Sequence, residues 1–277
     1  MAGDTTQSIV AWSLLVLIAV GGGSHALYGA GLNTNVALTP PQDGTILRAQ
    51  WRYSRLFGDP TPLDREVLLR VQPITLVHGF TADFAVLATV PIIHREIKFG
   101  SGAKQTDTGI GDIPLLVKYR FFQDDKPQQT TRWAMIGGAE VPTFDDPFSS
   151  KSFDPIIGTV WTHQRLDWWI DWDVLYKFNT AGGIAGDDEI RADVAASLTL
   201  LSGESENLGP WSLYAIGEIN AKYITDGSAQ VFASPGIQLF TSRWVVEAGV
   251  QLPVYQDMKS PRLETDFTFV LSVRILF

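Results

Sequence analysis

Residues 263–277, at the end of the chain, read LETDFTFVLSVRILF and alternate between two kinds of side chain. Successive side chains of a β-strand point to opposite faces, so this stretch predicts a strand with one apolar and one polar face. The apolar face includes Phe267, Phe269 and Leu271 and ends on Phe277, whereas the other face carries three charges. In a soluble β-domain the apolar face of such a strand points to the core, and in a membrane barrel it points to lipid.

The same alternation recurs about twelve times from residue 45 onwards, with clear examples at residues 45–57, 168–178 and 211–223. Polar or Gly- and Pro-containing stretches separate these segments, and no stretch has the period of a helix. The pattern predicts an all-β fold, a transmembrane antiparallel β-barrel of about 12 strands of the bacterial outer-membrane type. An even number of strands places both ends on one side, which is periplasmic in bacterial barrels.

The expected connections differ in length at the two ends of this barrel. Residues 81–83, 166–167 and 241–243 are predicted to be short periplasmic turns, as bacterial barrels require. Residues 123–130 and 202–208 would be rather long for periplasmic turns. On the outer side, residues 96–108 are predicted to form a polar loop.

Aromatic residues near the strand ends favour a membrane barrel over a soluble β-protein. Trp51, Tyr119, Trp168 and Trp244 stand near predicted strand ends, where barrels carry interfacial aromatic girdles. Closure of the sheet would pair every backbone group within the bilayer. A strand that ends on Phe277 resembles the terminal signal of outer-membrane barrels, which predicts the barrel-assembly machinery as a partner. A secreted β-sandwich or lectin remains the alternative.

Composition excludes several classes of function. The chain of 277 residues has a formal net charge of -9, so nucleic acid is not expected as a partner. It contains no Cys, which excludes disulfides and thiolate metal sites. Its few His residues do not stand at the spacing of a metal site, so we expect no metal and no cofactor.

The N-terminus predicts export. Residues 9–20 form an apolar run too short to span a bilayer, and small residues lead up to Ala26. We expect a signal peptide over residues 1–26, cleaved near Ala26, and a barrel domain over residues 27–277. The first eight residues contain Asp4 and no Lys or Arg, unlike a typical signal, which leaves a retained anchor or a different start as alternatives.

Charged residues on the polar faces are expected to line the lumen. The candidates are Arg48, Arg52, Arg70, Asp112, Lys118, Arg120, Glu140, Asp171, Asp173, Arg191, Asp193, Glu218, Glu247, Asp266 and Arg274. They could filter solutes by charge and width, or they could pair with one another and fill the interior. The sequence does not choose between these roles.

One stretch carries a family resemblance. The motifs are Gly79-Phe80-Thr81-Ala82-Asp83, a following strand with Pro91, and Gly109-Ile110-Gly111-Asp112-Ile113 leading to Lys118-Tyr119-Arg120. They resemble the outer-membrane β-barrel family of the meta-pathway of phenol degradation, which is transporter-like. The resemblance implies passage of small compounds, hydrophobic or aromatic ones among them, and supplies no catalytic residue. The glycines do not form a phosphate loop, because the trailing Gly-Lys-Ser/Thr and the helix are missing.

We therefore predict an outer-membrane channel or uptake barrel through which small compounds diffuse passively, with membrane lipid and a small solute as partners. The alternatives are a closed structural or adhesive barrel and an outer-membrane lipid hydrolase. His94 lies near Ser101 in sequence, but no spacing repeats a nucleophile–base pattern, so we expect no enzyme and no catalytic residue.

Overall fold

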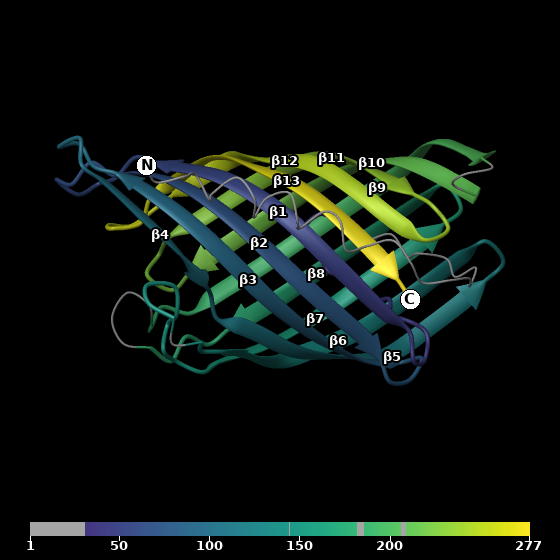
Figure 1. Cartoon of the computed structure of the whole chain (residues 1–277). Helices are drawn as coiled ribbons and strands as arrows, with labels where there is room; N and C mark the ends of the chain where they lie inside the picture. The colour runs from purple at the N-terminus through teal and green to yellow at the C-terminus, as the bar shows by residue number, and fades with distance from the viewer. Residues whose placement is uncertain (1–30, 144, 182–185, 206–208) are drawn as a thin grey trace, which may run out of the picture.

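A computed structural model describes residues 31–143, 145–181, 186–205 and 209–277 of the chain. The predicted signal peptide and its cleavage site at Ala26 lie outside these residues. The described part forms an all-β structure (Figure 1) with the strands β1 (Thr45–Phe57), β2 (Glu66–Gly79), β3 (Phe84–Lys98), β4 (Lys104–Ile110), β5 (Ile113–Lys126), β6 (Gln129–Val141), β7 (Asp154–Arg165), β8 (Trp168–Lys177), β9 (Glu189–Ser205), β10 (Gly209–Ile224), β11 (Ala229–Phe240), β12 (Trp244–Asp257) and β13 (Glu264–Leu276).

The strands form one closed antiparallel barrel. Apart from β4 and β5, strands that follow each other in sequence pair with each other, and β13 returns to pair with β1 over nearly its whole length. Thr45 and Phe277 exchange backbone hydrogen bonds at the seam, at 2.8 and 3.0 Å. Both β4 and β5 pair with β3, so they act as one strand that is interrupted at Gly111 and Asp112. The prediction of a barrel with about twelve strands is confirmed.

The side chains alternate in the sense expected of a membrane barrel. On β13, Phe269 and Leu271 are half exposed, whereas Val270, Ser272 and Arg274 are buried. On β8, Val174 is exposed while Asp171 and Asp173 are almost completely covered. The apolar side chains therefore face outwards and the charged ones face inwards, the reverse of a soluble β-domain.

Most periplasmic connections are shorter than the extracellular ones, as predicted. The two periplasmic turns that were expected to be long are short. β5 and β6 extend to a tight turn at Pro127 and Gln128, because residues 123–126 and 129–130 continue the ladder. β9 and β10 likewise continue as far as residues 205 and 209. The prediction of long periplasmic turns at residues 123–130 and 202–208 was therefore wrong.

The prediction of a polar outer loop at residues 96–108 was also wrong. β3 and β4 form a hairpin there, with Lys98 paired to Lys104, that extends the wall at the extracellular end. In the described part of the chain, no helix is long and apolar enough to cross a membrane.

Replacement of Leu271 by Arg tests the outward face of the barrel. Leu271 is near the middle of β13 and half exposed, so Leu271→Arg should lower the free energy of unfolding in phospholipid vesicles by about 2–4 kcal/mol. Val254→Arg, on an exposed residue near the extracellular end of β12, should cost about 0–1 kcal/mol. Equal costs in a denaturant titration would contradict a lipid-facing wall.

Candidate functional site: the barrel lumen

Residues 31–44 run inside the barrel before β1 begins. Leu32, Thr34, Ala37 and Thr39 of this N-terminal segment are buried, although the segment has no regular secondary structure. Its polar groups bond to side chains on the inward faces of β1, β5, β7, β8 and β10. Contacts on so many sides of the wall are possible only from within the lumen. The sequence suggested merely a polar lead, because nothing in its composition shows what surrounds it.

The start of the segment rests on a buried ionic network on β1, β12 and β13. Arg274 Nε donates to Glu247 Oε1 at 2.6 Å, and Arg48 lies 3.3 Å from Glu247 Oε2. Glu247 is fully buried and also accepts from Gln238 and Ser272. Arg48 in turn donates to the Leu32 carbonyl at 2.9 Å. The paired arginines and glutamate therefore hold the segment and one another.

Asn33 joins the segment to β10 and, at a second point, to β1. Its backbone and side-chain amides each donate to Glu218 Oε2 at 3.0 Å. Arg52 donates to Asn33 Oδ1 at 2.7 Å. A carboxylate on β10 and a guanidinium on β1 thus meet through one asparagine instead of directly.

β8 supplies the next attachment. Asp173 Oδ2 accepts from the Asn35 backbone at 2.5 Å, and Thr162 Oγ1 accepts from the Ala37 backbone at 2.9 Å while it donates to Asp171. Asp173 stands directly opposite Asp193 on β9. Two like charges at opposite positions repel, so the amides of the segment stabilise a site that would otherwise be unfavourable.

The family motif on β4 and β5 fastens three separate elements. Lys118 Nζ donates to the Val36 carbonyl of the segment at 2.6 Å. Arg120 donates to Ala82 O and Asp83 Oδ1 of the β2–β3 turn, at 2.8 and 2.7 Å. Asp112 accepts from the backbone of Thr143 and Ser150, at 3.1 and 2.7 Å, and so holds the loop between β6 and β7.

The first glycine of the motif makes room for that loop. A Cβ at Gly109 would lie 2.6 Å from Asp145 Oδ2 and 2.9 Å from the Phe148 ring, so a larger residue would displace these loop side chains. Asp145 accepts from the Ile110 backbone at 2.7 Å, and the Arg95 guanidinium lies 5.0 Å from the Phe148 ring centroid. The β6–β7 loop is thereby tied to the inner wall at the extracellular mouth.

The inward face of β2 and β3 is largely aliphatic. Two polar features interrupt it, namely the hydrogen-bonded pair Thr75 and Thr89, at 2.9 Å, and Arg95 near the extracellular end. Ile74 and Leu76 of β2 are exposed on the outside, so the alternate residues Leu69, Val71 and Val77 face the lumen. On β3 the inward positions include Leu87 and Ile93. These side chains keep part of their surface accessible, unlike the covered carboxylates of β8 and β12.

The predicted position of Arg70 was wrong. It was predicted to line the lumen, but it shares the outward face of β2 with Ile74 and pairs with Tyr53 and His94 across the ladder. Arg70 lies in the extracellular half of β2, from where a long charged side chain can reach the membrane boundary. The apolar inner face of β2 and β3 reverses the usual pattern, and the sequence reasoning missed both facts.

The other predicted residues lie near the extracellular mouth. Glu140 pairs with Lys177 at 2.9 Å, Arg191 with Glu189 at 3.2 Å, and Asp266 with Arg55 at 3.2 Å. Among the described residues no group of three His, Asp or Glu side chains could hold a metal ion. His94 bonds to Thr108 at 2.7 Å on the strand beside it.

Removal of Glu247 should destabilise the barrel strongly. Glu247→Ala leaves two inward arginines without their shared carboxylate and should lower the free energy of unfolding by about 3–5 kcal/mol. Asp266→Ala is the control, because its pair with Arg55 is exposed and should cost about 0–1 kcal/mol. Denaturant unfolding measures both, and similar costs would show that the network does not support the wall.

Lys118 and Asp112 should hold different elements. Lys118→Met removes the donor to the segment and should speed hydrogen exchange of residues 31–44 about tenfold, without affecting the β6–β7 loop. Asp112→Asn should speed hydrogen exchange of the β6–β7 loop without affecting residues 31–44. Exchange that changes in both elements, or in neither, for either variant would contradict this division.

Comparison with known proteins agrees with this architecture. The family model described as "Putative MetA-pathway of phenol degradation" matches residues 66–257. The structure is similar to the COG4313 outer membrane channel from Pseudomonas putida F1, with 10% identity over 87% of this chain and 98% of that chain, and a TM-score of 0.58. It is also similar to the β-domain of the Bordetella autotransporter Brka, with 10% identity over 85% of this chain and 100% of that one, and a TM-score of 0.50. No curated protein matches the chain. Because the family model covers more than half of its residues, the chain belongs to the "Putative MetA-pathway of phenol degradation" family.

Proposed function

We propose that the chain is an outer-membrane channel for small apolar compounds, aromatic ones among them. Family membership and the shared fold with a structure titled an outer membrane channel support this proposal. The single observation that carries it is the apolar inner wall of β2 and β3. An inward surface of aliphatic side chains is unusual in a barrel whose interior is otherwise polar, and it suits an apolar solute.

The lumen has two unlike sides. Asp173 on β8 and Glu218 on β10 are covered and bond to the N-terminal segment, and Glu247 on β12 is covered by Arg274, Ser272 and Gln238. The aliphatic side chains of β2 and β3 keep part of their surface accessible. A solute that enters between the extracellular loops passes the ion pairs of Glu140 with Lys177 and of Arg191 with Glu189 before it reaches the aliphatic wall. In this proposal the lumen charges hold the segment in place and do not act chiefly as a charge filter.

The segment forms the constriction on the periplasmic side. Ala37 packs with Ala134, Ile136 and Val160, and the backbone of Asp43 donates to Gly79 O at the periplasmic rim. On the far side Trp169, Tyr214 and Phe240 form a second inward cluster, with ring centroids 4.4 to 5.9 Å apart. A solute can therefore pass only if residues 31–44 move aside. The segment is held mainly by hydrogen bonds, which water can replace when it moves.

A closed structural barrel is the second candidate, because the periplasmic half of the lumen is filled. An enzyme is not favoured, since His78, His94 and His163 each bond to a threonine on the neighbouring strand. We propose no catalytic role and no cofactor. The exposed Phe277 beside the β1–β13 seam supports the further proposal that the barrel-assembly machinery reads the last strand.

Uptake of toluene by intact Gram-negative cells tests the channel, because their lipopolysaccharide leaflet slows apolar solutes. Val71→Asp places a charge on the aliphatic wall and should lower protein-dependent uptake about tenfold, which corresponds to about 1.4 kcal/mol. Val71→Leu keeps the wall apolar and should change uptake less than twofold. Equal uptake by both variants would contradict the proposed path, and no protein-dependent uptake in the parent chain would favour the closed barrel.

A further inference from the structure

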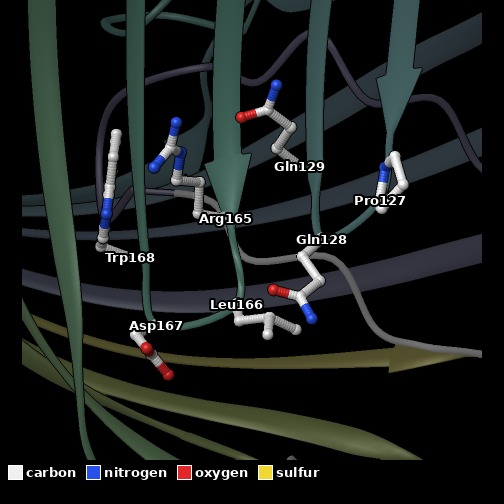
Figure 2. A pocket seen from close by; sticks show the side chains of 7 residues that line it. All are labelled: Pro127, Gln128, Gln129, Arg165, Leu166, Asp167 and Trp168. Atoms are coloured by element: carbon white, nitrogen blue, oxygen red, sulfur yellow. The ribbon is translucent and has the colours of Figure 1, made fainter.

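A polar pocket of about 280 Å³ lies on the rim of the barrel, away from the lumen. It is bordered by the β5–β6 turn at Pro127 and Gln128 and by the β7–β8 turn at Leu166 and Asp167. Gln129 and Arg165 stand directly opposite each other across β6 and β7. Figure 2 shows the side chains of Gln129, Arg165 and Trp168 extending in the same direction from neighbouring strand ends.

The pocket opens on the outer surface of the barrel. On β7, Arg165 and His163 alternate with the buried Thr162, so they point outwards. Trp168 likewise alternates with the buried Trp169. The shortest turns between described strands, at residues 127–128, 166–167 and 241–243, lie at this end of the barrel, which makes it the periplasmic end.

An aromatic patch places the pocket at the membrane boundary. Outward rings on β6, β7 and β8 contact one another in sequence: Trp133 with Trp172 at 5.6 Å, Trp161 with Trp172 at 6.4 Å, Trp161 with His163 at 6.0 Å, and His163 with Trp168 at 5.4 Å. Aromatic rings of this kind lie at headgroup level in membrane barrels. The pocket borders the periplasmic end of this patch, where lipid phosphates are found.

Arg165 has a free charge at this position. Its guanidinium carbon lies 5.7 Å from the Trp168 ring centroid, and within the described part of the chain no carboxylate reaches ion-pair distance of it. The cations nearer to β5 differ, since Arg120 pairs with Asp83 and Lys126 with Asp124, both at 2.7 Å. Figure 2 shows the Asp167 carboxylate directed away from the guanidinium.

We propose that this pocket binds the phosphate headgroup of an anionic phospholipid in the periplasmic leaflet. A guanidinium can donate two parallel hydrogen bonds to phosphate oxygens, and the Gln129 amide adds a third donor from the adjacent strand. The Trp168 ring holds the guanidinium in place on one side and meets the acyl region on the other. The site is independent of solute passage, because it lies outside the lumen.

Native mass spectrometry of the mature protein in detergent tests this site, with phosphatidylglycerol as the probe and phosphatidylcholine as the zwitterionic comparison. Arg165→Gln should weaken phosphatidylglycerol binding about 3- to 10-fold, since a half-exposed charge contributes modestly. Trp168→Leu should weaken it less. Arg243→Gln is the matched control, because Arg243 is an exposed arginine on another periplasmic turn, and its affinity should be unchanged.

Three results would overturn the proposal. Unchanged phosphatidylglycerol affinity in Arg165→Gln would show that this pocket does not bind the lipid. An equal loss of affinity in Arg243→Gln would show only a general attraction of the rim for anions. Displacement of phosphatidylglycerol by millimolar inorganic phosphate would identify a site for free phosphate in place of a lipid. Arg165→Gln should retain heat-modifiable migration in gels, which shows that the barrel still folds.

Discussion

The bilayer contains no water that could pair with backbone amides and carbonyls, and the rest of the structure depends on that constraint. Every strand must therefore find a partner on both sides, which the seam between β1 and β13 provides. Closure puts the apolar side chains outside and leaves an interior that the protein must fill by other means. A twelve-stranded barrel is too wide for its own side chains to pack across it. Residues 31–44 supply the missing material in the periplasmic half.

The segment that fills the lumen also supplies hydrogen-bond partners for the inward charges. Carboxylates and guanidinium groups are costly to bury unless hydrogen-bond partners surround them. The backbone of the N-terminal segment offers many such partners because it forms no regular structure of its own. Glu218, Asp173 and Lys118 each bond to it. The family motif contacts an element in each half of the barrel, since Lys118 holds the N-terminal segment and Asp112 holds the β6–β7 loop.

Much of the fold could be predicted from the sequence, since lipid on one side and polar groups on the other impose a strict period of two. The bounds of β1 and β13 and the tight turn at 166–167 follow directly from it. The site was predicted less well. Inward charges on β8, β10 and β12 were identified by parity, but their partners in residues 31–44 were not, because that segment has no period. Arg70 was misplaced because β2 is apolar on its inner face, so the rule that polar residues face the lumen fails where the proposed path lies.

Single-channel conductance of a chain of residues 40–277 tests most directly whether the N-terminal segment closes the lumen. We expect frequent, stable current steps in a planar bilayer, and rare or small steps for residues 27–277 under the same conditions. Heat-modifiable migration establishes that the shortened chain is a folded barrel. A folded but silent shortened barrel would contradict the claim that the N-terminal segment is what closes the lumen.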